Sequence, residues 1–120
     1  MLAQNVSGAN GFQLQGSALY WMLPGQSGTQ NGYIQTCALP ACSATSYLVK
    51  GLSYPSGLLV DAGGAYWITA PTPSIQRCVG STCTGGAQSW VTSVTAPHDL
   101  TADAGFVYWA DGNAIYRIAK

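Results

Sequence analysis

The chain carries very little charge. Of its 120 residues only four are Lys or Arg and four are Asp or Glu, so the formal net charge is zero. Without a basic stripe to neutralise phosphates, the chain is not expected to bind nucleic acid. Low charge also means weak repulsion between copies, which favours self-association.

Long apolar runs and strong helix formers are also scarce. No stretch approaches the roughly 20 apolar residues of a membrane-spanning helix, so no membrane partner is expected. Runs of Ala, Leu, Glu and Lys are missing too. Short β-branched or aromatic segments instead alternate with clusters of Gly, Pro and Ser, and the glycines number fifteen. This pattern is typical of an all-β protein.

The four cysteines form two pairs with one spacing, Cys37 with Cys42 and Cys78 with Cys83. Because zinc sites usually use C-x2-C pairs, this spacing fits metal poorly, and we expect no metal and no cofactor. The pairs favour two local disulfides, each closing a hairpin loop, with reduced thiols as the alternative. Disulfides imply an extracellular or periplasmic protein. Since residues 1–4 do not resemble a signal peptide, we expect the chain to be a mature piece or an excised fragment with an added Met.

One dipeptide recurs three times, as Tyr20-Trp21, Tyr66-Trp67 and Tyr108-Trp109. The eleven-residue runs that end in these pairs, at 11–21, 57–67 and 99–109, align without a gap. The segments before them, 2–11, 48–57 and 90–99, also align, and a later motif begins at Ile34, Ile75 and Ile115. A period of about 40 to 46 residues is that of a four-stranded propeller blade.

The alignment divides the chain into repeats at about 2–46, 47–88 and 89–120, within a single domain. Each repeat is predicted to hold an outer strand, an inner strand, the Tyr-Trp strand and a third strand. The outer strands are expected at 2–6, 47–50 and 89–94, and the inner strands at 12–15, 58–61 and 100–103. The Tyr-Trp strands are expected at 18–23, 65–70 and 106–110, and the third strands at 32–37, 74–79 and 114–119. Gly16, Gly63-Gly64 and Gly105 are expected to supply positive φ in the turns before the Tyr-Trp strands.

The third repeat preserves a recognisable pattern: Pro97, Leu100, Asp103, then Val-Tyr-Trp-Ala-Asp at 107–111, Ile115 and Arg117. This pattern resembles propeller repeats built on a Tyr-Trp-Thr-Asp motif, and the related NHL-like repeats. The resemblance implies a six-bladed β-propeller, of which this chain supplies three blades. Since propellers have about four to eight blades, three are too few to close a ring. The resemblance and the strand order therefore imply a homodimer, in which residues 2–6 complete the last blade of a partner. The alternative is a fragment of a larger propeller that assembles with a different number of copies.

The Tyr-Trp pairs are interpreted as packing between blades, because they recur at one position in every repeat. Asp61 and Asp103, each at the end of an inner strand, are expected to cap turn amides.

Candidate binding residues come from two places. Asn10, Ser56 and His98 precede the inner strands at one offset, and Asp111 is expected on the same face. The variable loop 24–31 contributes Gln26, Gln30 and Asn31, whose amides suit a small glycan or peptide. Ser56, His98 and Asp111 could be written as a catalytic triad, but their spacing does not support one. We therefore expect a non-enzymatic scaffold or binding module, with a lectin-like protein and a propeller lyase or hydrolase as alternatives.

Overall fold

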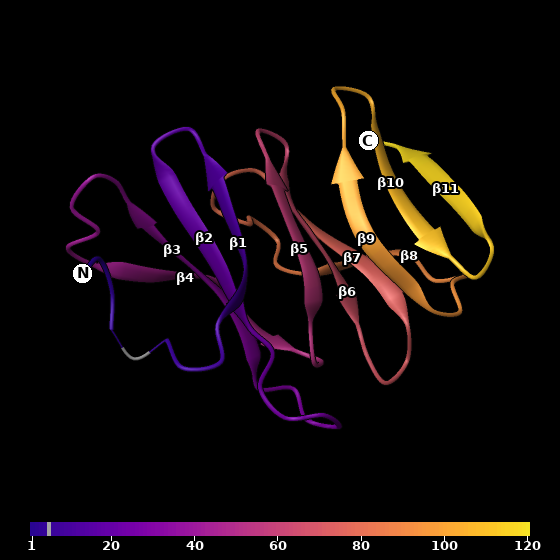
Figure 1. Ribbon diagram of the computed structural model, residues 1–120, viewed down its shortest axis with the longest axis horizontal. Helices are drawn as coiled ribbons and strands as arrows, with labels where there is room; N and C mark the ends of the chain where they lie inside the picture. The colour runs from indigo at the N-terminus through magenta and orange to yellow at the C-terminus, as the bar shows by residue number, and fades with distance from the viewer. Residues whose placement is uncertain (5) are drawn as a thin grey trace.

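The computed structural model describes residues 1–4 and 6–120. In this part of the chain it contains eleven β-strands arranged as three antiparallel sheets (Figure 1). The all-β prediction is confirmed. No helix in the described residues is long and apolar enough to cross a membrane.

Within each sheet, strands that follow one another in the chain are hydrogen-bonded neighbours. The first sheet holds β1 (Asn10–Gln15), β2 (Ala18–Leu23), β3 (Gly32–Ala38) and β4 (Thr45–Leu52). The second holds β5 (Ser56–Asp61), β6 (Gly64–Thr69), β7 (Ser74–Val79) and β8 (Gln88–Val91). The third holds β9 (Pro97–Ala102), β10 (Phe106–Asp111) and β11 (Ala114–Ala119). Each Tyr-Trp pair therefore lies on the second strand of its sheet.

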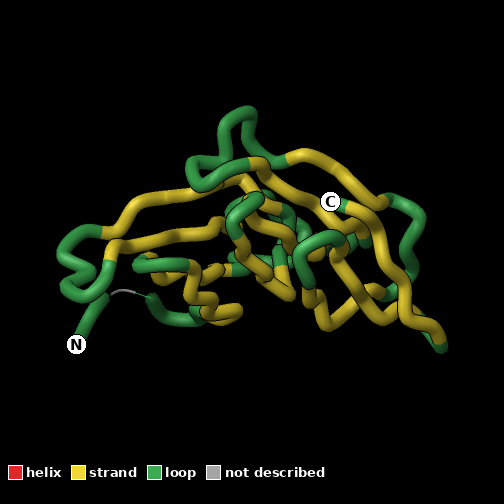
Figure 2. The backbone as a smooth tube through the Cα atoms, turned by 90° about the horizontal axis from the view of Figure 1, so that it is seen from above, coloured by secondary structure: helices red, strands yellow, loops and turns green. Residues whose placement is uncertain are grey.

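The three inner strands lie next to one another, since β5 contacts both β1 and β9. Seen from above, the sheets spread apart from this row of inner strands (Figure 2). Gly11 in β1 shows how closely the first two sheets approach, because a Cβ built there would lie 2.9 Å from the Cβ of Leu58.

Eleven of the twelve predicted strands are present, with small differences at their ends. The exception is the outer strand predicted at 2–6. Residues 2–4 and 6 are not in a strand, and Asn5 lies outside the described residues. The strand predicted at 89–94 ends at Val91, because the chain then leaves the second sheet and Val94 packs against the Trp109 cluster near the third.

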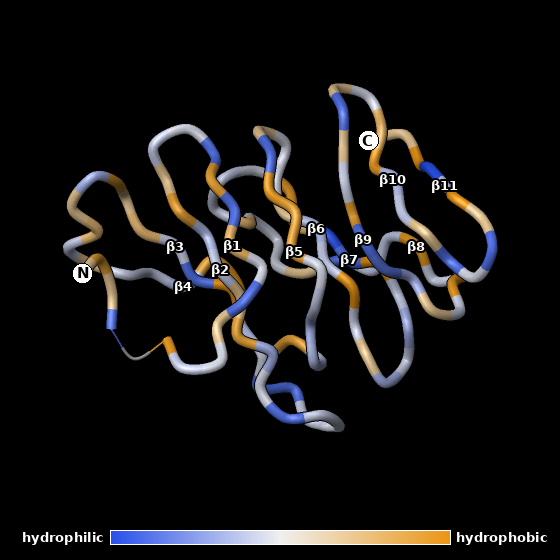
Figure 3. The backbone as a smooth tube through the Cα atoms, in the orientation of Figure 1, coloured by the Kyte–Doolittle hydropathy of each residue, from blue (hydrophilic) through white to orange (hydrophobic). Residues whose placement is uncertain are grey.

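The apolar core lies between the sheets, as the period-2 pattern of the strands requires. Tyr20, Met22 and Ile34 of the first sheet pack against Leu58, Val60 and Trp67 of the second. Figure 3 shows apolar stretches along β1, β2 and β5. A second cluster joins Ile68 and Ile75 of the second sheet to Trp109 of the third. The interpretation of the Tyr-Trp pairs as core residues is confirmed for Trp21, Trp67 and Trp109, and for Tyr20 and Tyr66.

A third cluster forms on the other side of the first sheet. Trp21 and the buried Cys37 and Cys42 pack there against Ala3, Val6 and Ala9 from the N-terminal segment. The repeat alignment explains this contact, because Val49 and Leu52 occupy the same places in the cluster around Trp67.

Both predicted disulfides are present. Cys37 is bonded to Cys42 with a Cα–Cα distance of 5.0 Å, and Cys78 is bonded to Cys83 with a distance of 4.9 Å. All four sulfurs belong to buried residues. Two disulfides indicate an oxidising environment outside the cytoplasm.

Candidate functional site

Asn10, Ser56 and His98 lie at the beginning of the three adjacent inner strands. Their antiparallel partners are Met22, Ile68 and Ala110, each of which directly follows the Trp of its pair. The three side chains therefore occupy equivalent, exposed places at one end of the molecule, where β1, β5 and β9 start (Figure 1).

A bulge follows each of these residues, because one residue in every inner strand has positive φ. Gly11, Gly57 and Asp99 have φ values of 63°, 62° and 59°. Asp99 thus adopts a backbone conformation that favours glycine. Its carboxylate Oδ2 lies 2.7 Å from Nδ1 of His98. The imidazole of His98 is thus oriented by its own neighbour.

Asp111 binds the turn that leads into the third sheet. Its Oδ2 accepts a hydrogen bond from the Thr95 amide and its Oδ1 accepts one from the Ala96 amide, both at 2.8 Å. These two bonds lower the pKa of Asp111. Since the imidazole pairs with Asp99 and the carboxylate holds this turn, no hydrogen bond among the described residues links Ser56, His98 and Asp111 as a triad.

The loop at 24–31 is organised by Asn31. The Oδ1 atom of Asn31 accepts hydrogen bonds from the Gln26 amide at 2.9 Å and from the Thr29 hydroxyl at 2.5 Å. Gln26 and Gln30 are exposed. Gln26, Asn31 and Tyr33 line a hollow of about 380 Å³ beside this loop. The amide oxygen of Asn31 is therefore engaged in shaping the loop.

The two capping carboxylates behave as predicted. Asp61 Oδ1 accepts a hydrogen bond from the Gly63 amide, and Asp103 Oδ1 accepts bonds from the Gly105 and Phe106 amides, all at 2.8 Å. The expectation of positive φ holds in the first two turns, at Gly16 and at Gly64 of the Gly63-Gly64 pair, but is wrong for Gly105 in the third. At Gly105 the two hydrogen bonds to Asp103 hold the turn in place of a left-handed residue.

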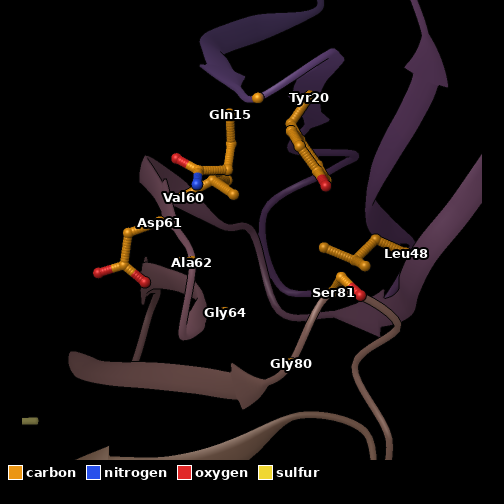
Figure 4. Close-up of a pocket in the computed structure, with 10 residues that line it drawn as sticks. Gln15, Tyr20, Leu48, Val60, Asp61, Ala62, Gly64, Gly80 and Ser81 are labelled. Carbon is orange, nitrogen blue, oxygen red and sulfur yellow. The ribbon is translucent and has the colours of Figure 1, made fainter.

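Sequence patterns did not reveal a cleft between the first and second sheets. Its volume is about 200 Å³, and Gln15, Tyr20, Val60 and Ser81 contribute to its walls (Figure 4). The side chains of Gln15 and Tyr20 come from the first sheet and face the second across the cleft (Figure 4).

The first and third sheets each expose apolar side chains on their outer face. The residues at the equivalent positions of the other repeats are buried. Ile34 and Ile75 lie near the start of the third strand of their sheets and are both 0% exposed, whereas Ile115 at the equivalent place is 74% exposed. On β1, Phe12 and Leu14 are 56% and 64% exposed, although the equivalent Leu58 and Val60 of β5 are buried. At the equivalent positions Ile34, Ile75, Leu58 and Val60, a neighbouring sheet of the chain or the cluster at its edge covers the side chain.

Within residues 1–4 and 6–120, no group of three or more His, Cys, Asp or Glu side chains could hold a metal ion. The chain matches no known protein-family model and no curated protein sequence.

Proposed function

We propose that the protein is a non-enzymatic scaffold and binding module, in which two copies close into one six-sheet β-propeller. The main support for this proposal is that Ile115 is exposed, although the residues at the equivalent position of the other two repeats, Ile34 and Ile75, are fully buried. Phe12 and Leu14 supply a matching apolar face at the other end of the chain. Joining the two faces removes both from water, which is the main driving force for association.

The N-terminal segment supports a strand exchange at each junction. In the middle of the chain, β4 and β8 each pair with the third strand of one sheet while their apolar residues pack on the Trp of the next. Ala3 and Val6 make the equivalent contact with Trp21. In the proposed dimer, the N-terminal segment of one copy pairs with β11, the edge strand of the third sheet, in the other copy.

The known pairings give the register of this exchange. Ile34 pairs with Val49 and Ile75 pairs with Val91. In the repeat alignment Val49 and Val91 correspond to Ala3, so Ala3 of the second copy is placed opposite Ile115. Each copy gives its segment to the other, and the two-fold pair of contacts leaves no β edge open.

The binding role rests on the row of Asn10, Ser56 and His98, which the ring would repeat around its channel, and on Gln26 and Gln30 in the exposed loop. A small glycan or peptide is the ligand class that these polar side chains suit. A Ser56–His98–Asp111 triad has no support in the hydrogen bonds, because the Thr95 and Ala96 amides engage both carboxylate oxygens of Asp111. The two disulfides fit an extracellular or periplasmic location.

The mass in solution tests the assembly. Light scattering is expected to give twice the 12.5 kDa of one chain. Ile115→Asp should yield a folded monomer, because it buries an unpaired charge in the junction. Tyr54→Asp, a change at another exposed apolar residue, should remain dimeric. The proposal would be overturned if the wild-type chain were a folded monomer at every protein concentration tested. It would also be overturned if the Ile115→Asp and Tyr54→Asp variants had equal masses.

The register has its own test. A chain with Ala3→Cys and Ile115→Cys should form a disulfide-linked dimer under oxidation. Gln4→Cys with Ile115→Cys should not, since a slip of one residue turns the side chain to the other face. Equal cross-linking of both pairs would contradict the register while leaving the mass result intact.

A further inference from the structure

The cleft between the first and second sheets has a counterpart between the second and third. Both are lined at the same places of the repeat, where inner strands end and third strands finish. The equivalent lining positions are Gln15 and Asp61, Val60 and Ala102, Asp61 and Asp103, Ala62 and Ala104, and Gly80 and Lys120. The backbone agrees, because Gly80 and Lys120 donate to the carbonyl oxygens of the equivalent Gly63 and Gly105.

In the cleft between the second and third sheets, the chain places its own ammonium group. Lys120 Nζ lies 2.5 Å from Asp61 Oδ2 and donates to the carbonyl oxygen of Asp103, also at 2.5 Å. In the first cleft Gln15 replaces the Asp and Gly80 replaces the Lys. The first cleft therefore lacks the equivalents of both partners in this ion pair. Because residue 80 is glycine, no side chain fills the space that Lys120 occupies in the other cleft.

Tyr20 points into this open cleft (Figure 4). The residue is only 7% exposed as a whole, but its hydroxyl is not among the buried polar atoms that lack a partner, so it lies at the open side of the cleft. The equivalent Tyr108 donates a hydrogen bond to Asp103 Oδ2 at 2.6 Å. A hydroxyl at the wall of an open cleft can donate to and accept from a ligand in place of water.

We propose that this cleft binds a neutral polyol of the size of one sugar ring. Gln15, Tyr20 and Ser81 can each donate and accept hydrogen bonds, which matches the hydroxyls of a sugar. Leu48 and Val60 supply an apolar wall for its C–H face. The volume of about 200 Å³ is below that of drug-sized sites, which suits a single ring.

A cationic ligand fits the cleft less well. Asp61 is the charged residue among those that line it. One of its carboxylate oxygens accepts the Gly63 amide and the other pairs with Lys120. The negative charge is thus already neutralised within the chain, and the remaining groups are uncharged.

Backbone-amide NMR of the full 120-residue chain tests the site, with glucose as the probe. Up to about 100 mM glucose should shift the signals of Gly16, Gly64 and Gly80 in a saturable way, as a millimolar site requires. Tyr20→Phe should weaken binding at least several-fold. The control Tyr108→Phe removes the equivalent hydroxyl outside the cleft and should leave binding unchanged. Butylamine at the same concentration should not shift these signals.

Three outcomes would overturn the proposal: no saturable shift with glucose, equal effects of the two Tyr variants, or tighter binding of butylamine than of glucose. Because the cleft lies within one chain, the result does not depend on the mass measured in solution. If the chain were a monomer that binds glucose, only the proposed six-sheet dimer would be refuted. If it were a dimer that does not bind glucose, only the proposed polyol site would be refuted.

Discussion

Lys120 and Asp61 form an ion pair between the third and second sheets, with 2.5 Å between Nζ and Oδ2. Both side chains are about four-fifths buried. The hydrogen bond to Asp61 raises the pKa of Lys120. The pair therefore joins the end of the third sheet to the inner strand of the second.

Replacing Lys120 with Met should lower the free energy of unfolding by about 1 kcal/mol, the upper range for a partly exposed pair. Because the pKa is raised in the folded chain, the contribution is present at neutral pH and is lost as pH rises through the range in which lysine titrates. Urea unfolding at pH 7 and above the lysine pKa measures both effects. Lys50→Met is the control, since Lys50 is exposed over the Tyr47 ring. A Lys120→Met loss that persists undiminished at high pH would exclude the ion pair as its cause.

Asp103 should show an acid-side dependence. The Tyr108 hydroxyl, followed by the Gly105 and Phe106 amides, lowers the pKa of Asp103. A carboxyl with a lowered folded pKa stabilises the fold above its ordinary pKa, and this contribution is lost as pH falls through the folded value. Tyr108→Phe should raise the pKa of Asp103 toward its ordinary range, as measured by carboxyl-carbon NMR. An unchanged pKa in that variant would show that the two amides alone hold the carboxylate.

The strand order could be predicted from the sequence because the Tyr-Trp repeats fix it locally. Three aligned copies indicate where each inner strand, turn and Tyr-Trp strand lies, and Asp61 and Asp103 could be assigned to turns from their place before glycine. The N-terminal segment differs from the other two outer strands, because its residues 2–4 and 6 pair with none of the three sheets.

The sites were less predictable because they depend on contacts between sheets. The sequence indicated Asp111 as a candidate binding residue, whereas the amides of Thr95 and Ala96 engage both of its oxygens. The first cleft has a sequence signal that becomes readable only with the structure. Gln15 and Gly80 stand where Asp61 and Lys120 form an ion pair, but they are far apart in the chain until the sheets are placed side by side.

Asp99→Gly should stabilise the fold. Asp99 has a φ of 59°, and the equivalent residues, Gly11 and Gly57, adopt this conformation without a side-chain penalty. Removing the strain should increase the free energy of unfolding by up to about 1 kcal/mol. The contact with His98 is lost in this variant, but both side chains are largely exposed, so the cost is small. Thermal unfolding would measure the gain.

The reverse change provides the control. Gly57→Ala should destabilise the chain by about 1 kcal/mol or more, since φ is 62° there and the new Cβ would lie 3.2 Å from Ile68 Cδ1. If Asp99→Gly lowered stability, the His98–Asp99 contact would outweigh the backbone strain.

The two disulfides should differ in their contribution to stability although they close loops of equal length. In the chain-entropy model, each should contribute roughly 2 kcal/mol. Cys78 and Cys83 also pack in the large cluster between the first and second sheets, whereas Cys37 and Cys42 pack only around Trp21. Replacing Cys78 and Cys83 with Ala should therefore cost more than replacing Cys37 and Cys42, because smaller side chains leave a cavity in the larger core. Urea midpoints of the two double variants, with matched m-values, measure the difference. Equal midpoints would mean that loop closure alone accounts for both disulfides.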